Sequence, residues 1–454
     1  MNINKYLLLS IIVAASAGFL FGFDTGNIAG ALVFIARDFH ASALQSEWIV
    51  SITIFAAFLG AVFSGKAVDV YGRKSLLIFS GFLYVIGTVF CTVSQSIVDL
   101  VMARFILGLA IGVSSYTAPL YISEIAPAQF RGFFVLLNGV AITSGEAIAY
   151  GLDYHFSFNQ DWRNMFLVGI IPAIIFCIGT RFMPCSPRWL VTKGKTREAK
   201  KILLKFYKPA KAENELLEIQ KPSIQSENLI SIIKNKSYKR LLFIGISLGI
   251  FQQFFGINVV MYYGPFIFEK AGFHSASSDI LLTFYLGVVN TVLTIITGLI
   301  IDRFGRRKLL MIGSVIAGCS LFTLSALFHI GIHYPWQGMM MMICMVTFII
   351  GYCISVGSLF WLIISEIFPL SIRGQAMSIA TATQWLANFA VSLSFLSLLN
   401  TIGPSITFSM YASVCCMAVI FTYFYVPETK RSTLEDIEIG NLSNTYSFGN
   451  QTVA

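Results

Sequence analysis

The chain has 454 residues, of which 56% are hydrophobic and only 12% are charged. A soluble globular protein carries about twice that share of charge, so the composition excludes an ordinary soluble protein. The formal net charge of +9 comes from Lys and Arg placed in short loops between apolar runs, not from one basic domain. We therefore expect a membrane protein whose partner is the lipid bilayer and not nucleic acid.

Apolar runs of about 20 residues, the length of a membrane-spanning helix, recur along almost the whole chain. The first run resembles a secretory signal peptide through Lys5 and Ala15-Ser16-Ala17, but it continues past Asp24 and is interpreted as a retained span. The sequence predicts an all-α membrane protein with twelve spans. Their expected positions are about residues 7–36, 48–68, 75–97, 99–122, 131–153, 164–183, 241–270, 280–301, 308–330, 337–365, 374–399 and 404–426.

A polar, Lys-rich segment divides these spans into two groups of six. The expected domains are an N-terminal bundle (1–183), a cytoplasmic helical linker (184–240), a C-terminal bundle (241–426) and a tail (427–454). Lys and Arg gather in the loops of one side, so the positive-inside rule places both termini and the linker in the cytoplasm. Within the linker, Thr196 is the expected N-cap of a helix over 197–207, with further helix over 212–220.

Two loop motifs occur once in each half. The sequence DVYGRK at 69–74 returns as DRFGRR at 302–307, and SEIAP followed by RG at 123–132 returns as SEIFP followed by RG at 365–374. Such duplication predicts two six-helix bundles with the solute at their interface. The loop charges could only hold the loops inside the cell, or they could pair across the bundles and stabilise one conformation. The residues expected to gate in this way are Asp69, Arg73, Glu124, Arg131, Asp302, Arg306, Glu366 and Arg373.

The seventh apolar run contains the carboxamides Gln252, Gln253 and Asn258, and glycines and a proline interrupt it. Carboxamides are costly in hydrocarbon without partners, and a broken spanning helix is tolerated where it lines a cavity. This run therefore predicts a site for an uncharged, hydroxyl-rich solute. The alternative is that the three amides only join neighbouring helices.

Over nearly its full length, the chain resembles the sugar porter family of the major facilitator superfamily. The resemblance rests on the motifs above together with Tyr262-Tyr263, PCSPRWL at 184–190 and PETK at 427–430. Within the family it is most similar to the bacterial D-xylose–proton symporters, through Trp361 and QWLAN at 384–388. The resemblance implies the major facilitator fold and sugar import by alternating access.

The resemblance also implies which residues contact the sugar. Amides donate and accept hydrogen bonds to hydroxyl groups, and an indole covers the apolar face of a sugar ring. The matching positions are Gln252, Gln253, Asn258, Asn290, Trp361, Gln384, Trp385 and Asn388. For the two tryptophans the alternative is interfacial anchoring. Tyr262 and Tyr263 are assigned to gating.

The chain departs from the family pattern at three positions. Gly139 stands where the family has a sugar-contacting Gln, which leaves room for a bulkier or differently oriented substrate. Glu146, seven residues on and on the same helix face, replaces a second Gln and is expected to bind the sugar or to take up a proton. Ser358 replaces a proline, so the break in the tenth span is expected to be softer.

Asp24 lies inside the first span, where a charge costs about 2.5–3.5 kcal/mol on insertion scales. The family's symporters pair such an Asp with an Arg in the fourth span, here Arg104. We expect Asp24 to be the proton site and Arg104 its partner. The alternative is a static ion pair in a passive sugar facilitator.

Other functional classes receive less support. The 8 cysteines and 5 histidines show no metal-ligand or disulfide spacing, and no nucleophile–base set or phosphate loop is found. We therefore expect neither an enzyme nor a bound cofactor, but a protein that functions as a monomer with a sugar and a proton as its small partners. A proton-driven exporter and a transporter-like sugar sensor are the remaining rivals. Xylose, glucose, galactose and cyclitols all suit the same residue types.

Overall fold

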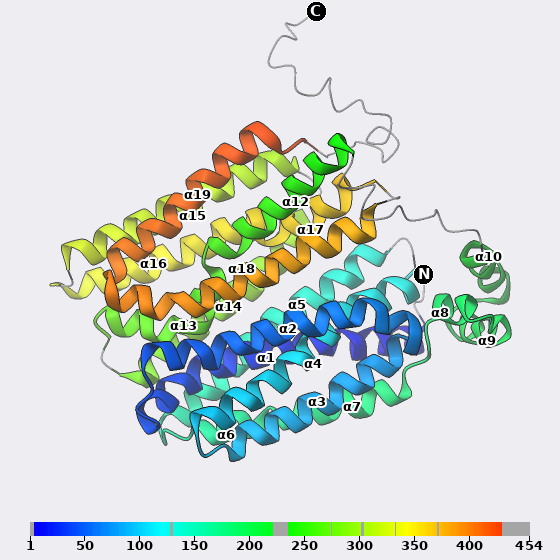
Figure 1. Cartoon of the computed structure of the whole chain (residues 1–454), viewed down its shortest axis with the longest axis horizontal. Helices are drawn as coiled ribbons and strands as arrows, with labels where there is room; N and C mark the ends of the chain where they lie inside the picture. Colours follow the sequence, from blue (N-terminus) through cyan, green and yellow to red (C-terminus); the bar gives the residue numbers. More distant parts are fainter. Residues whose placement is uncertain are drawn as a thin grey trace, which may run out of the picture. The chain divides into compact units, whose positions relative to one another are not determined.

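The computed structural model describes residues 4–127, 130–220, 235–273, 275–300, 304–331, 333–369 and 372–428, which form helices without any β-strand (Figure 1). Twelve spans in this part of the chain are long and apolar enough to cross a membrane, so the predicted all-α membrane fold is confirmed. The first half contains α1 (Lys5–Asp38), α2 (Ala43–Tyr71), α3 (Arg73–Val93), α4 (Ile97–Ile125), α5 (Arg131–Ser157), α6 (Trp162–Val168) and α7 (Ile170–Phe182). The linker contains α8 (Pro187–Thr192), α9 (Thr196–Phe206) and α10 (Pro209–Gln220). The second half contains α12 (Lys236–Phe254), α13 (Ile257–Lys270), α14 (Ala276–Ile300), α15 (Arg306–Ile330), α16 (Pro335–Tyr352), the π-helical turn η2 (Cys353–Gly357), α17 (Ser358–Ile367), α18 (Arg373–Thr401) and α19 (Gly403–Tyr425).

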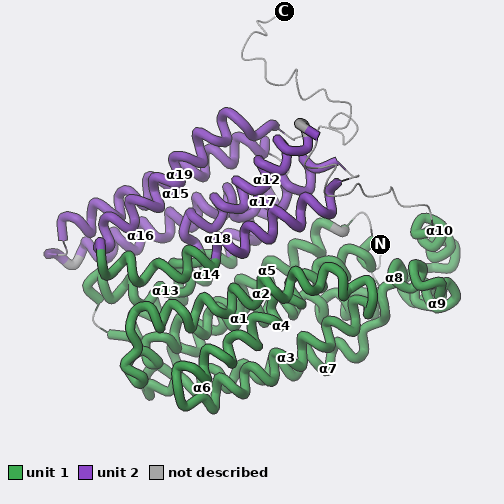
Figure 2. Tube along the Cα trace, in the orientation of Figure 1, with its two compact units in different colours: residues 1–223, 258–291, 389–401 green, residues 224–257, 292–388, 402–454 purple. Residues whose placement is uncertain are grey.

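The chain forms two compact units, which Figure 2 draws in different colours. Unit 1 comprises residues 1–223, 258–291 and 389–401, and unit 2 comprises residues 224–257, 292–388 and 402–454. Unit 1 thus contains α13 and most of α14 beside the first six spans. The domain boundaries expected from the sequence follow the duplicated halves instead, and that division stays a prediction.

Within unit 1, α1 and α5 touch through their backbones. A Cβ atom built on Gly22 would lie 1.7 Å from the carbonyl oxygen of Ile142, and one built on Gly26 would lie 2.5 Å from that of Glu146. Any side chain larger than hydrogen would therefore push the helices apart. Small residues allow this close approach in membrane helices, where packing replaces the hydrophobic effect as the driving force.

The seventh span is broken, as the sequence predicts. Helix α12 ends at Phe254 and α13 begins at Ile257, with Gly256 between them at φ 90°. Glycine adopts this left-handed conformation without steric cost. A second irregularity follows at Tyr263 (φ −119°, ψ 17°), two residues before Pro265. The broken span frees backbone groups near the amides of α12.

The tenth span is also broken, although it lacks the proline of the family pattern. The π-helical turn η2 separates α16 from α17, and Ser355 within it has non-helical angles (φ −111°, ψ −119°). Single π-helical turns inside α-helices are frequently found at functional sites. The replacement of proline by Ser358 has therefore not removed the interruption.

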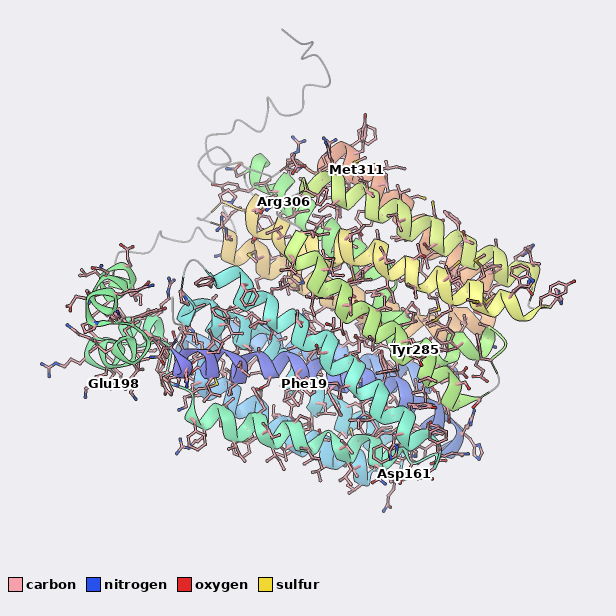
Figure 3. The ribbon with its side chains drawn as sticks, turned by 180° about the vertical axis from the view of Figure 1, so that it is seen from behind. Phe19, Asp161, Glu198, Tyr285, Arg306 and Met311 are labelled. Atoms are coloured by element: carbon pink, nitrogen blue, oxygen red, sulfur yellow. The ribbon has the colours of Figure 1, made fainter. Side chains whose placement is uncertain are left out.

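The linker helices α8 to α10 pack on one another. Their small apolar core consists of Leu190, Ala199, Leu203, Ala212 and Leu216. Figure 3 marks this group by Glu198. The prediction of Thr196 as N-cap is wrong, because α9 begins at Thr196 itself after Lys195, which makes no side-chain capping bond.

Candidate transport site

A buried ion pair joins the first and fourth spans. Nη1 of Arg104 lies 2.6 Å from Oδ1 of Asp24, and the two side chains are only 2% and 9% exposed. Nε of Arg104 also donates to the carbonyl oxygen of Ile49 at 3.3 Å, so one guanidinium links α1, α2 and α4. Removing either charge would leave the other buried and unpaired, which is strongly destabilising. The structure brings the expected pair together, and its role in proton coupling stays a prediction.

On α5, Glu146 is buried and lies against α14. Its carboxylate accepts long hydrogen bonds from the Tyr150 hydroxyl (3.4 Å) and from Nδ2 of Asn290 (3.5 Å). Two of the residues expected to contact the sugar, Glu146 and Asn290, therefore lie together. A Cβ atom at Gly139 would meet no atom within 4 Å, so α5 leaves space where the family pattern has Gln.

Within unit 2, the amide of Gln252 spans the break in the tenth span. Its Nε2 donates to the carbonyl oxygens of Val356 and Gly357, both at 3.3 Å. Its buried Oε1 has no hydrogen-bond partner among the described residues. Gln252 thus joins two helices, as the alternative to sugar binding predicts. Its Oε1 nevertheless remains an acceptor for a hydroxyl group. Its neighbour Gln253 is also buried, and Asn258 at the start of α13 is partly buried.

The remaining residues expected to contact the sugar lie on α17 and α18. Trp361 is 45% exposed, so much of its indole is uncovered by the chain. Trp385 and Asn388 are buried, and the buried Oε1 of Gln384 has no partner in the described part of the chain. Of the whole expected set, Glu146, Asn258 and Asn290 belong to unit 1, and the others belong to unit 2.

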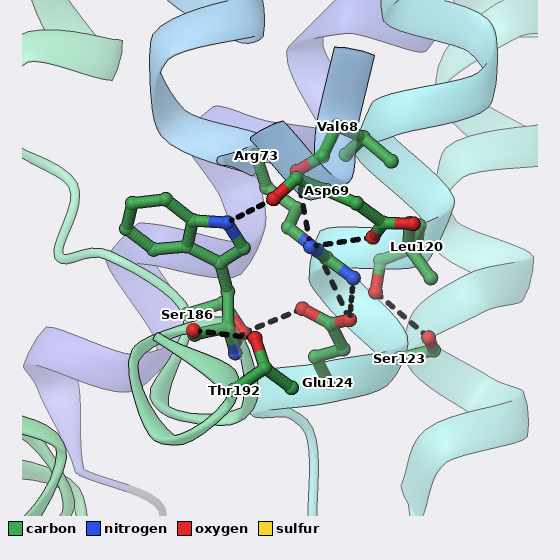
Figure 4. A network of polar contacts seen from close by, with 9 residues as sticks. Val68, Asp69, Arg73, Leu120, Ser123, Glu124, Ser186 and Thr192 are labelled. Carbon is green, nitrogen blue, oxygen red and sulfur yellow. Dashed lines mark hydrogen bonds and ion pairs between the residues drawn. The ribbon is translucent and has the colours of Figure 1, made fainter. Parts of the chain in front are cut away.

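The duplicated loop of the first half forms a closed polar network (Figure 4). Arg73 lies 2.7 Å from Oε1 of Glu124 and 3.3 Å from Oδ1 of Asp69. From the linker, the Ser186 hydroxyl donates to Oε2 of Glu124 at 2.5 Å, and the indole Nε1 of Trp189 donates to the carbonyl oxygen of Asp69 at 3.0 Å.

The loop of the second half uses the matching residues. Nη2 of Arg306 lies 3.1 Å from Oε1 of Glu366, and Nε of Arg373 donates to the carbonyl oxygen of Phe368 at 3.0 Å. Glu428, after the last span, accepts from the backbone N–H groups of Arg306 (2.9 Å) and Arg307 (3.3 Å). Each of these ion pairs joins residues of a single unit, so bridging between bundles stays a prediction. Asp302 and the side chain of Arg131 lie outside the described residues.

The two tyrosines assigned to gating are buried in unit 1. The Tyr263 hydroxyl donates to the carbonyl oxygen of Ser392 at 2.7 Å, and its ring stacks on Phe395 with centroids 5.5 Å apart. Tyr262 lies beside it in α13. These contacts join α13 to the end of α18.

Sequence reasoning overlooked three buried carboxylates, Glu47, Asp153 and Asp279. Glu47 of α2 accepts hydrogen bonds from the backbone nitrogen and the hydroxyl of Ser397, both at 2.6 Å. Asp153 of α5 is 1% exposed, and its Oδ2 has no partner among the described residues. The available signal was a carboxylate inside an apolar run, which marks a functional site by default. Asp24 was selected by this signal, and Glu146 was selected because it replaces a Gln of the family pattern.

Twelve spans, two of them interrupted next to amides and an indole, together with a buried ion pair within unit 1, define a multi-span membrane transporter. A family model described as "Sugar (and other) transporter" matches residues 10–440, and the chain belongs to this family, whose members are transporters and not enzymes. It is 40% identical to the galactose-proton symporter of Escherichia coli K12 over 96% of this chain and 94% of that protein. It is 37% identical to the arabinose-proton symporter of the same strain over 94% and 92%. The inward-open structure of the E. coli xylose transporter, a major facilitator superfamily protein, superimposes with a TM-score of 0.83 at 29% identity, covering 95% of this chain and 99% of that one. The expected fold and family are thereby confirmed.

Proposed function

We propose that this protein imports a sugar together with a proton by alternating access. The family, together with the galactose-proton and arabinose-proton symport of the two E. coli relatives, supports sugar as the substrate and the proton as the driving ion. The observation that carries the coupling is the buried pair of Asp24 and Arg104. A passive facilitator has no need of a titratable carboxyl group at that depth.

The pair can act as the coupling device because it links three helices. Ionised Asp24 holds Arg104, which also bonds the backbone of α2. A proton on Asp24 removes the negative charge and leaves Arg104 without its counterion, so a second arrangement of these helices becomes favourable. One charge that crosses 100 mV supplies about 2.3 kcal/mol, which corresponds to roughly 50-fold accumulation per proton.

The sugar is held by amides and indoles. The unpartnered acceptor atoms of Gln252 and Gln384 suit hydroxyl donors, and the uncovered indole of Trp361 suits the apolar face of a pyranose or cyclitol ring. The space at Gly139 allows a larger ring substituent at that position than the family's Gln would.

The protein functions as a monomer in the inner membrane, with both termini and the linker in the cytoplasm. The positive-inside distribution of Lys and Arg supports this orientation. One chain supplies every residue of the expected sugar set, which supports the monomer. No step of the proposed cycle involves nucleic acid or a cofactor.

Replacement of Asp24 by Asn tests the proposal. Proteoliposomes with an imposed pH gradient are given labelled galactose, arabinose, xylose, glucose and myo-inositol. We expect the parent protein to concentrate at least one of them and Asp24→Asn to lose accumulation while it retains counterflow exchange. Asp99→Asn, which changes a carboxylate at the start of α4 outside the pair, is the matched control. Uphill uptake by Asp24→Asn would overturn the proposal.

A further inference from the structure

Helix α5 carries four polar residues on one face. Glu146, Tyr150, Asp153 and Ser157 follow one another at spacings of four, three and four residues, and all four are buried. We call them the α5 polar stripe. At 1.5 Å per residue, the stripe extends about 16 Å from the end of α5 to Glu146. Four buried polar residues on a membrane helix require a reason beyond packing.

Contacts with α13 and α14 follow the stripe along its length. At its end, the hydroxyl oxygens of Ser157 and Ser277 lie 2.8 Å apart. Further along, the Tyr150 hydroxyl lies 2.6 Å from the carbonyl oxygen of Met261 and 3.4 Å from Oε1 of Glu146. Asn290 then bonds the other oxygen of Glu146. Hydrogen-bonding groups are therefore present from the helix end to the carboxylate.

Asp153 lies in the middle of the stripe without a counterion. Oδ2 of Asp153 has no hydrogen-bond partner among the described residues, and a Cβ atom on Gly30 of α1 would lie 2.5 Å from it. Neither Asp153 nor Glu146 forms an ion pair in the described part of the chain. A buried carboxylate in such a place needs a bound proton or a compensating charge.

A cavity of about 120 Å³ lies beyond Asp153 on the same face of α1. Val33 and Arg37, three and seven residues after Gly30, line it together with Glu269 of α13 and Asp279 of α14. Asp279 is buried, and its Oδ1 has no partner among the described residues. A polar cavity with unsatisfied acceptors is a suitable place for water.

The charged and titratable groups on the helices packed around the stripe are limited in number. On α1 and α4 they are Lys5, Tyr6, Asp24, Arg37, Asp38, Asp99, Arg104, Tyr116, Tyr121 and Glu124, and on α6, α13 and α14 they are Arg163, Tyr262, Tyr263, Glu269, Lys270, Asp279 and Tyr285. Asp24 and Arg104 pair with each other, and Arg163 lies over the Trp162 ring. Arg37, Glu269 and Asp279 share the cavity.

From this geometry we infer that Glu146 is a second proton-binding site, loaded from the outer face through the cavity, Asp153 and the α5 polar stripe. A hydronium ion of the external water in the cavity gives a proton to Asp153 and becomes water. The Tyr150 hydroxyl then accepts this proton from Asp153 as it passes its own proton to Oε1 of Glu146, so the relay leaves Asp153 ionised again and Tyr150 neutral. The proton leaves from Glu146 to cytoplasmic water in the inward-facing state. This inference rests on the proposed proton symport and on its orientation, and it predicts two protons for each sugar.

The charge moved per sugar distinguishes one proton site from two. In proteoliposomes, the reversal potential of sugar-dependent current under defined sugar and pH gradients gives this number. We expect two charges for the parent protein and one for Glu146→Gln. The limiting accumulation at 100 mV should then fall about 50-fold. A value of one for both proteins would overturn the inference but leave symport intact, whereas a value of zero for the parent would overturn the proposed function.

Two further measurements keep the inference testable if Glu146→Gln is inactive. In the parent protein, pH-difference infrared spectra should contain a carboxylic-acid band that Glu146→Gln lacks, and its persistence in that variant would contradict the inference. Asp153→Asn should retain two charges per sugar but lose the dependence of uptake rate on outer pH. Asp38→Asn, at the end of α1 and bonded to Trp162, is the matched control. If Glu146→Gln raises the KM for sugar with coupling unchanged, Glu146 binds sugar and no proton.

Discussion

The two duplicated loops keep the same Arg–Glu pair and complete it with different third partners. In the first half, Ser186 bonds Glu124, and in the second half, Glu428 bonds the backbone at Arg306. Ser186 follows the sixth span and Glu428 follows the twelfth, so both partners come from the same point of the repeat. The position of this third partner in the repeat is the same in both halves, but its residue type and the group that it bonds differ.

The difference also appears in burial. Glu124 is 8% exposed and Glu366 is 25% exposed, so water can solvate the second carboxylate more easily than the first. The first loop receives a hydroxyl and an indole from the linker, and the second receives the Glu428 carboxylate at the start of α15.

The largest expected effect comes from Arg73→Met. It leaves Glu124 buried without its cation, and we expect a loss of about 3–5 kcal/mol of unfolding free energy. Arg306→Met should cost less, because Glu366 is more exposed. Thermal unfolding of the purified protein measures both. Lys200→Met, which breaks the exposed pair with Glu213, is the control and should cost about 0–1 kcal/mol. Equal losses for the two arginine variants would contradict the comparison.

An intermediate effect is expected for Glu428→Gln. Gly305 precedes α15 and makes no side-chain capping bond, so Glu428 supplies the negative charge at this helix start. Loss of that charge should cost about 1 kcal/mol. Hydrogen exchange should increase at the amides of Arg306 and Arg307 and remain unchanged at Arg73. Unchanged exchange at all three amides would show that Glu428 caps nothing.

The smallest effect is expected for Trp189→Phe. The ring continues to cover Gly72, but the hydrogen bond from Nε1 to Asp69 is lost. One such bond contributes about 0.5–1.5 kcal/mol. Combination with Arg73→Met should give less than the sum of the two losses, because both residues belong to one network. Additive losses of unfolding free energy would show that the Trp189 indole is energetically independent of the Arg73 network.

Much of the architecture could be predicted from the sequence because membrane helices reveal themselves by length and hydropathy. The break near Gly256 followed from residue types that only an interrupted helix tolerates. The interruption at Ser355 was less predictable, because no proline marks it and a π-helical turn depends on packing. The capping error at Thr196 has a similar cause, since an N-cap is defined by backbone angles that shift by one residue.

The residue types of the site could be predicted from the sequence, whereas most of their hydrogen-bond partners could not. Hydropathy selects a carboxylate such as Asp24 inside an apolar run, but it does not say which neighbour satisfies it. Asp153 and Glu47 were overlooked, although the free-energy cost of a buried charge in a membrane span applies to them as well. The donation from Gln252 to carbonyl oxygens of the tenth span could not be derived from spacing, because those residues are about a hundred positions apart.

The glycine contacts between α1 and α5 have a mechanical consequence. Helices α1 and α5, whose backbones touch at Gly22 and Gly26, cannot slide past each other. They therefore move as one rigid body. Asp24 lies on α1 and Glu146 lies on α5. A movement that opens one carboxylate to the far side of the membrane must therefore carry the other with it, and both carboxylates would then change sides in a single movement.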